Sequence, residues 1–161
     1  MGTLWTPWRL AYIMGDKGGA ECVFCTAGAA QDDESVLVVH RGRRSFVVLN
    51  RYPYNNGHVM VAPTAHCGEL GALDAETRAE IMDLAAVSEG VLKQAYRPEG
   101  LNLGINLGRA AGAGIVGHLH FHVVPRWNGD TNYMSVINDV RVVPERLEDS
   151  YRRLRPLYAR L

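Results

Sequence analysis

The chain has 161 residues, and its 17 Lys and Arg balance its 17 Asp and Glu. This length predicts one globular domain over residues 1–161, which can bury roughly two thirds of the surface that the unfolded chain exposes. The balanced charge removes the broad basic field on which nonspecific nucleic-acid binding depends. The apolar runs are far shorter than the roughly 20 residues of a membrane-spanning helix. We therefore expect neither a nucleic acid nor a membrane as a partner.

The N-terminus and the cysteines indicate the compartment. The first nine residues lack the basic start, the apolar stretch and the small-residue cleavage site of a secretory signal. The chain has three cysteines, an odd number, in a sequence without an export signal. These features predict that the mature chain begins at Met1 and is cytoplasmic.

Two cysteines, Cys22 and Cys25, have the Cys-x-x-Cys spacing of a metal knuckle or a redox pair. A thioredoxin-like redox site lies just after a strand and opens a helix, whereas the glycines around this pair predict a loop. The pair therefore favours metal binding over redox chemistry. The plain structural alternative is two small residues packed under a loop.

The middle of the chain predicts five short strands, because β-branched or alternating runs are bounded there by Gly, Pro or Asn. The runs cover residues 36–40, 46–50, 58–62, 101–106 and 118–124, and we expect the first three to be antiparallel neighbours.

Apolar residues at three- and four-residue steps predict two helices. Asp74 caps one that runs to about Tyr96, and the other starts at Pro144 and runs to Leu161. No repeat or composition break divides the chain. These elements predict an α+β fold in which an antiparallel sheet of about five strands packs with two main helices.

The last predicted strand carries three alternate histidines, His118, His120 and His122. Its period of two puts the three imidazoles on one face, roughly 6.5 to 7 Å apart, and the intervening apolar residues on a core face. One such histidine is usually structural, but three in register need a common cause. Ligands spread along one strand cannot all converge at about 2 Å from one zinc ion. Nucleophilic attack on phosphorus fits better, since one imidazole can attack while a neighbour bonds the phosphoryl oxygens.

The His-φ-His-φ-His-φ-φ run resembles the histidine-triad (HIT) family of nucleotide hydrolases and transferases. Residues 46–53 and 57–61 resemble the family's ribose-binding strand and turn, and residues 104–108 resemble its strand before the triad. The flanking segments 4–9 and 125–130 resemble those of diadenosine tetraphosphate (Ap4A) phosphorylases and hydrolases. The resemblance extends from about Cys22 to Asp130 and implies a HIT-like fold.

The same resemblance implies roles for individual residues. His120 is expected to be the nucleophile that takes a nucleotidyl group from an α-phosphate, and His122 to contact the phosphate. Asn50 matches the ribose-binding position, and Asn106 matches a polar position near the α-phosphate. The glycine-rich segment before the triad could surround phosphates with backbone N–H groups. The remaining expected substrate-binding residues are Gly112, Gly114 and Trp127.

One part of this glycine-rich segment departs from the family pattern. Many relatives place Gln and then Ser or Thr where this chain has Gly114 and Ile115. The chain therefore lacks a hydroxyl that could donate a proton to a leaving group. An ADP- or ATP-like leaving group needs little protonation, whereas the amine of a phosphoramidate needs a proton. The departure weakens the interpretation as a phosphoramidase.

Cys22 and Cys25, together with His66 and His118, form a candidate closed Cys₂His₂ site for a structural Zn²⁺. This set resembles the zinc site of some bacterial HIT proteins. Cys67, next to His66, is either a bystander or the ligand in its place. His40 and His58 are interpreted as structural.

The leading hypothesis is an enzyme that cleaves Ap4A-like dinucleoside polyphosphates through a nucleotidyl-histidine, with orthophosphate favoured over water as the acceptor. One alternative is a nucleoside phosphoramidate hydrolase. Another is a nucleotide-binding module whose triad is inactive. The resemblance further implies a homodimer in which two sheets join across the two-fold axis.

Overall fold

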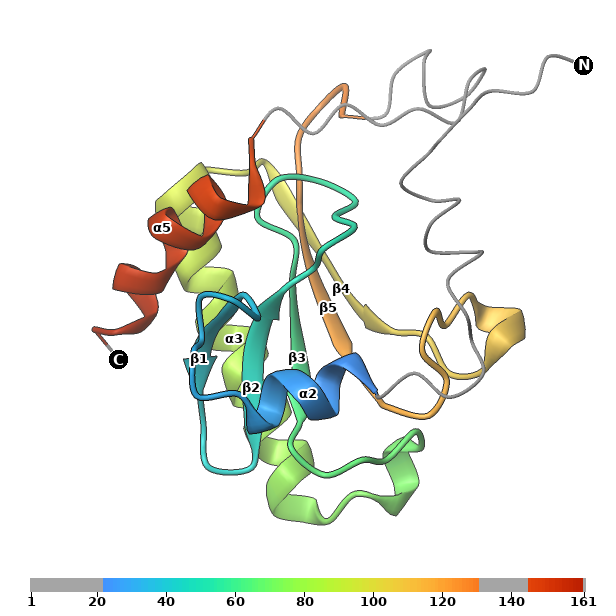
Figure 1. Cartoon of the computed structure of the whole chain (residues 1–161). Helices are drawn as coiled ribbons and strands as arrows, with labels where there is room; N and C mark the ends of the chain where they lie inside the picture. The colour runs from blue at the N-terminus through green and yellow to red at the C-terminus, as the bar shows by residue number, and fades with distance from the viewer. Residues whose placement is uncertain (1–21, 131–144, 161) are drawn as a thin grey trace, which may run out of the picture.

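A five-stranded antiparallel sheet forms the centre of the molecule (Figure 1). The computed structural model describes residues 22–130 and 145–160. Neighbouring strands follow the order β1-β2-β3-β5-β4, and every neighbouring pair is antiparallel. The strands are β1 (Val38–Arg41), β2 (Ser45–Leu49), β3 (Val59–Pro63), β4 (Gly100–Ile105) and β5 (Phe121–Arg126).

The described residues contain three α-helices beside the sheet: α2 (Val23–Ala29), α3 (Ala75–Tyr96) and α5 (Leu147–Tyr158). Two 3₁₀ turns, η1 (Leu70–Ala72) and η2 (Arg109–Ala111), lie in the connections. The predicted α+β class, with its antiparallel sheet, is confirmed. Among the described residues, no helix has both the length and the apolar character needed to cross a membrane.

The long helix α3 agrees closely with its prediction. The Asp74 side chain accepts a hydrogen bond from the Thr77 backbone N–H, as an N-cap should. The helix ends where Arg97 takes a left-handed conformation with φ of 48°. The predicted second helix corresponds to α5, which begins at Leu147. Its predicted ends, Pro144 and Leu161, lie outside the described residues, as do the N-terminal residues 4–9.

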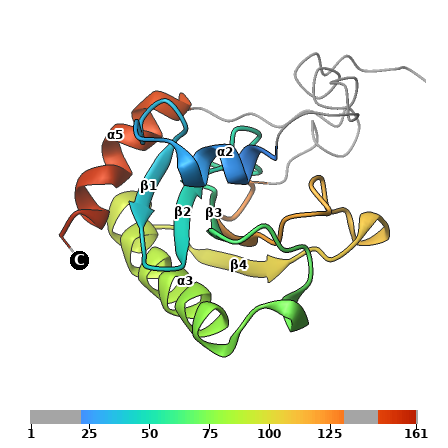
Figure 2. The same ribbon diagram turned by 60° about the horizontal axis from the view of Figure 1, so that its bottom comes forward.

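The two faces of the sheet are covered unequally. Helices α3 and α5 pack on one face, and α2 lies on the other, near β2 (Figures 1 and 2). Paired residues share a face in an antiparallel ladder, so the register places Met60 and His122 on the same face. Residues of the opposite face, such as Val59 and Val123, are fully buried. Among the described elements, α2 leaves the β5–β4 part of its face uncovered.

The predicted strand over residues 118–124 is wrong at its start. Strand β5 begins at Phe121, which pairs with Ile105, the last residue of β4. The preceding Leu119 N–H instead donates to the Cys67 carbonyl at 2.7 Å. His118 and His120 therefore lie just before the strand. The expected division into an imidazole face and a core face is also incomplete, because every residue from 118 to 124 is buried.

The first predicted strand begins two residues later than expected. Leu37 has a φ of 62°, and the N–H groups of Leu37 and Val38 bond back to carbonyls of the preceding turn. Such a left-handed residue does not continue a strand. The other strand boundaries differ from their predictions by one or two residues.

The expectation that the Cys-x-x-Cys pair does not open a helix is wrong, because Cys22 is the N-cap of α2 and Cys25 lies inside this helix. The upstream Gly18 and Gly19, predicted as a loop, lie outside the described residues. Seven residues are too few to show a helical period, and Gly28 lies within them. Tertiary contacts hold the helix instead. Phe24 is buried, and the Arg41 guanidinium donates to the carbonyls of Ala27, Gly28 and Ala30.

Candidate active site and metal centre

The buried imidazole of His120 presents one bare nitrogen. Its Nδ1 donates to the His118 carbonyl at 2.8 Å. A carbonyl oxygen can only accept, so the proton of the neutral ring is on Nδ1 and the lone pair is on Nε2. Burial lowers the pKa of His120, while the bond to the His118 carbonyl opposes this shift. The ring of Phe24, from α2, stacks on His120 with centroids 4.8 Å apart. His120 is thus a neutral imidazole held in place with its Nε2 lone pair available.

The adjacent His122 has the opposite polarity, which is set through His58. The backbone N–H of Tyr54 donates to His58 Nδ1 at 3.1 Å, so that nitrogen accepts. His58 Nε2 lies 2.9 Å from His122 Nδ1 and must carry the proton of this bond. His122 Nδ1 accepts it, which leaves the proton of neutral His122 on Nε2. A main-chain group therefore fixes the proton of a side chain two hydrogen bonds away.

The Nε2–H of His122 is buried and has no hydrogen-bond partner among the described residues. Burial and the nearby His120 lower the pKa of His122 to about 4, so the ring is neutral near pH 7. The two rings are 4.9 Å apart and nearly perpendicular. A ring with a bare nitrogen therefore lies next to a ring with an unsatisfied N–H donor. This pair can attack an electrophilic centre and bond one of its oxygens.

Four predicted metal ligands come together at the start of α2. The ligand atoms of Cys22, Cys25, His66 and His118 all lie within 4.8 Å of one another. Cys22 Sγ is 3.3 Å from His118 Nδ1, and Cys25 Sγ is 3.2 Å from His66 Nδ1. Zinc bonds of about 2.0 to 2.3 Å at tetrahedral angles require ligand separations of about 3.3 to 3.8 Å. The four residues fit a closed zinc site.

The orientation of His118 also suits a metal. Its Nε2 donates to the Pro63 carbonyl at 2.8 Å, which leaves the lone pair on Nδ1, the nitrogen that faces the two sulfur atoms. Such a bond to the second ring nitrogen is typical of zinc-binding histidines. The carbonyl of the same residue holds His120. The candidate metal site and the candidate nucleophile therefore share His118.

A close backbone contact brings the two histidine ligands together. A Cβ on Gly68 would lie 2.5 Å from the Val116 carbonyl oxygen, so only glycine lets these two loops approach. Cys67 lies next to His66 but is outside the four-ligand cluster, and its Sγ contacts the Glu69 carbonyl. Within the described part of the chain, the structure therefore favours the bystander interpretation of Cys67.

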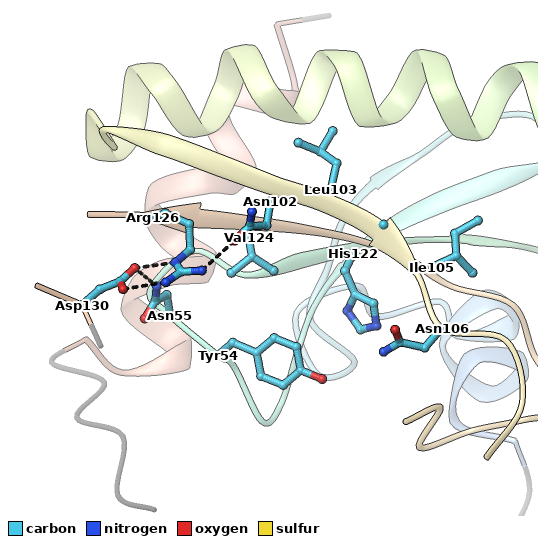
Figure 3. A pocket seen from close by; sticks show the side chains of 11 residues that line it. Tyr54, Asn55, Asn102, Leu103, Ile105, Asn106, His122, Val124, Arg126 and Asp130 are labelled. Atoms are coloured by element: carbon cyan, nitrogen blue, oxygen red, sulfur yellow. Dashed lines mark hydrogen bonds and ion pairs between the residues drawn. The ribbon is translucent and has the colours of Figure 1, made fainter. Parts of the chain in front are cut away.

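Two further predicted site residues, Asn106 and Asn50, lie near His122 and His58, respectively. Asn106 and His122 line a common pocket (Figure 3). Asn50 caps its own turn, since its Oδ1 accepts from the Tyr52 N–H, and its Nδ2 lies 3.4 Å from His58 Nδ1.

The remaining three predicted site residues lie in loops. The Gly112 N–H donates to the Arg109 carbonyl in η2, and Gly114 follows in the same loop. Trp127 lies in the turn after β5, where its N–H donates to Asp130. Neither Gly112, Gly114 nor Trp127 lines the pocket with His122.

The interpretation of His58 as merely structural missed its contact with His122. The Gly-His dipeptide before β3 was visible in the sequence, but it carries no spacing that links it to the triad. Only the pairing of β3 with β5 brings the two rings together. Phe24 was missed for a similar reason, because its contact depends on the unpredicted helix α2.

Comparisons with known proteins agree with this geometry. Residues 31–129 match the family model of the HIT domain. The chain is 41% identical to a protein of Mycobacterium tuberculosis named AP-4-A phosphorylase, over 98% of this chain and 84% of the relative. It is 30% identical to an adenosine 5'-monophosphoramidase of Schizosaccharomyces pombe, over 66% of this chain and 75% of the relative.

The structure is also similar to solved structures. A Zn-bound histidine triad family protein from Mycobacterium smegmatis superposes with a TM-score of 0.68 and 30% identity, over 87% of this chain and 94% of that protein. A histidine triad nucleotide-binding protein from Sulfolobus tokodaii superposes with the same TM-score and 27% identity, over 87% of this chain and 93% of that protein.

Proposed function

The chain belongs to the histidine-triad (HIT) domain family, and on this premise we propose that it cleaves dinucleoside polyphosphates such as Ap4A by nucleotidyl transfer to His120. The observation that carries the proposal is the lone pair of His120 Nε2 beside the unpartnered N–H of His122. The 41% identity to an AP-4-A phosphorylase supports the choice of substrate.

The first step is an attack on the α-phosphorus of Ap4A. His120 Nε2 forms a bond to phosphorus, and the bridging P–O bond breaks with its electron pair leaving on ATP. His122 Nε2–H donates to a phosphoryl oxygen and stabilises the charge that develops there. The carbonyl of His118 holds the ring of His120 through Nδ1 and stabilises the positive charge that the attack creates.

In the second step, an oxygen of orthophosphate bonds to the same phosphorus. The P–N bond breaks, its electron pair returns to His120 Nε2, and ADP is released. Water in place of orthophosphate would give AMP. Orthophosphate must be positioned by the site to compete with water, which is far more concentrated. We favour phosphorolysis because this matches the 41% identical relative and because Gly114 and Ile115 offer no hydroxyl to order a water.

The products formed from Ap4A test this proposal directly. The wild-type protein is incubated with Ap4A, with and without orthophosphate. Phosphorolysis gives ADP and ATP and depends on orthophosphate, whereas hydrolysis gives AMP and ATP at an unchanged rate. Adenosine 5'-phosphoramidate serves as the second substrate, because a relative 30% identical to the chain is named a monophosphoramidase. Faster cleavage of the phosphoramidate would contradict the proposal, and binding without turnover would favour an inactive nucleotide-binding module.

We further propose that one Zn²⁺ is held by Cys22, Cys25, His66 and His118. When bound, the ion supplies a structural crosslink, because four protein ligands leave no position open for a substrate. We also propose that the protein is a cytoplasmic homodimer and that residues 1–161 form one HIT domain. The fit of the four ligand atoms and the Zn-bound relative from M. smegmatis support the metal.

A further inference from the structure

A pocket of about 350 Å³ extends from His122 along the uncovered part of the sheet (Figure 3). Its floor is formed by residues of β4 and β5 that share one face, and the register places Gly104 opposite His122 and Asn102 opposite Val124. The ring of Tyr54, which is 43% exposed, stands across from this floor. This volume is typical of a pocket for a small molecule.

The pocket begins at His122 and leads away from the nucleophile. His122 and Asn106 line its near end, whereas His120 does not line it. The pocket continues along β5 as far as Arg126, four residues further, a distance of about 13 Å at the rise of a strand. Because Gly104 has no side chain, the passage beside His122 stays open, and a Cβ there would meet no atom within 4 Å.

The far end of the pocket is polar but carries balanced charge. The Arg126 guanidinium bonds both carboxylate oxygens of Asp130, at 2.6 and 2.8 Å, and donates to Asn102 Oδ1 at 2.6 Å. Asn55 Nδ2 also donates to Asp130, at 2.7 Å. The guanidinium holds the pKa of Asp130 well below its usual range, so this carboxylate is charged. A paired cation beside an anion does not attract a further phosphate, and amides suit a neutral polar group.

From this shape and charge we infer that the pocket binds the leaving nucleotide, with its polyphosphate beside Gly104 and its nucleoside at the end formed by Asn102 and Arg126. The inference rests on the proposed function. An in-line attack by His120 expels the leaving group away from its imidazole. The pocket is lined by His122, which bonds the phosphoryl oxygen, and not by His120, so it offers space for a group that departs from the attacking ring. The aromatic wall of Tyr54 and the apolar floor at Val124 suit a nucleobase.

The inference is tested by narrowing the pocket at Gly104 in a graded series, Gly104→Ala, Gly104→Val and Gly104→Leu. Two substrates that transfer the same adenylyl group are compared. The leaving group of Ap4A is ATP, whereas that of adenosine 5'-phosphorofluoridate is a single fluoride ion. We expect the kcat/KM for Ap4A to fall with side-chain size, by about tenfold or more for Gly104→Val, and that for the phosphorofluoridate to change less than about threefold. Gly100→Val is the matched control, because Gly100 lies on the same strand, has the same open space and does not line the pocket.

The substitution Asn102→Ala tests the position of the nucleoside. We expect it to lower the kcat/KM for Ap4A by about fivefold or more and to leave that for adenosine 5'-tetraphosphate, which lacks the second nucleoside, within about twofold. The inference would be overturned if a variant lowered kcat/KM equally for Ap4A and for its paired substrate. It would also be overturned if neither the Gly104 variants nor Asn102→Ala changed the kcat/KM for Ap4A. In both cases the proposed function would stand. If the wild-type protein cleaves neither Ap4A nor the phosphorofluoridate, the proposed function fails and this inference fails with it. Gly104→Ala keeps the test open if larger side chains prevent folding, since alanine is tolerated where the backbone is not strained.

Discussion

Main-chain groups fix which ring nitrogen carries the proton in His58, His120 and His122. The Tyr54 N–H can only donate to His58, and the His118 carbonyl can only accept from His120. Between these two fixed ends, the ring bond from His58 to His122 has one consistent direction. The result is one bare nitrogen and one N–H donor in adjacent rings.

The first prediction concerns the nucleophile. His120→Asn keeps an amide of similar shape that can still bond the His118 carbonyl, but it removes the Nε2 lone pair. We expect kcat for Ap4A to fall by at least about a thousandfold, because the covalent route is lost, while the affinity for the nucleotide changes little. Steady-state kinetics and calorimetric titration measure the two quantities.

The matched control is His40→Asn, since His40 packs near Tyr158 and lies outside the cluster. This variant should retain activity within about twofold of the wild type. Activity of His120→Asn within tenfold of the wild type would exclude His120 as the nucleophile.

The second prediction uses the lowered pKa of His122. The folded state has a pKa of about 4 for this group, against about 6.5 in an unfolded chain. Between these values the unfolded chain binds the proton and the folded protein does not, so stability falls as the pH decreases from about 6.5 towards 4. We expect His122 to account for about 1 to 2 kcal/mol of the free energy of unfolding lost between about pH 7.5 and pH 5.

Urea denaturation of the wild type and of His122→Gln at both pH values measures this quantity. Glutamine does not titrate, so the variant lacks the pH dependence that His122 contributes. The difference in unfolding free energy between the two proteins should therefore shift with pH. A difference that does not depend on pH would show that the His122 pKa is not lowered.

The sequence predicts functional residues where their spacing along the chain forms a recognisable pattern. The triad is such a case, since its alternation is visible in residues 118–122, and the Cys-x-x-Cys pair is another. His58 and Phe24 have no such spacing. Their contacts with His122 and His120 arise from strand pairing and from a helix that packs over the sheet. Such contacts over long sequence separations depend on the fold and cannot be predicted from spacing alone.

At the scale of elements, α2 connects the candidate metal centre to His120, the proposed nucleophile. Cys22 and Cys25 lie at the start of α2, Phe24 between them packs against His120, and the end of the helix is held by Arg41. A helix of seven residues is not stable by itself in water. Its position therefore depends on these three attachments.

The third prediction concerns the metal at this helix. We expect one zinc ion per chain in the wild type, and its removal by a chelator should lower the melting temperature by about 5 to 10 °C. The rate of Ap4A cleavage per folded molecule should change little when the zinc is removed, because the closed site takes no part in the chemistry. The main effect should be on the melting temperature. Elemental analysis and thermal denaturation measure these effects on untagged protein.

Two cysteine variants separate the metal from a general effect of losing a thiol. Cys25→Ser removes a ligand and should lose the zinc, whereas Cys67→Ser, outside the cluster, should retain it. Wild-type protein without any bound metal, or equal zinc loss from both variants, would contradict the proposed site.

The elements also differ in how well the sequence predicts them. The 22 residues of α3 contain six turns of apolar periodicity and a capping aspartate, and both predicted ends are correct to within a residue. The strands have four to six residues, so a left-handed residue such as Leu37 or a side-chain cap such as Asn50 moves a boundary by a large fraction of the element. Helix α2 is shorter than two helical periods and had no signal to detect.

At the scale of the whole molecule, β4 lies at one end of the sheet, and among the described strands it pairs only with β5. An unpaired strand edge is a site for association with another chain. Leu103 on β4 is 43% exposed, so apolar surface lies on this edge. Figure 2 shows β4 as an outer strand with α3 beside it.

The fourth prediction is that two chains pair through β4 across a two-fold axis, as the proposed homodimer requires. Equilibrium sedimentation at micromolar concentration should give twice the 17.8 kDa mass of the chain. Leu103→Lys places a charge at the edge and should produce a monomer, because charged edge strands resist pairing. Val23→Lys is the matched control, since Val23 is 59% exposed and belongs to α2, which is not part of the sheet. A wild-type monomer, or a Leu103→Lys variant that remains dimeric, would exclude β4 as the interface. In such a dimer, the pockets of the two chains lie on either side of the shared β4 edge, because Asn102 and Gly104 of β4 line the pocket. Loss of pairing should therefore lower the rate of Ap4A turnover through these two residues. His120 and His122 should keep their geometry, because α2 and β3 hold them.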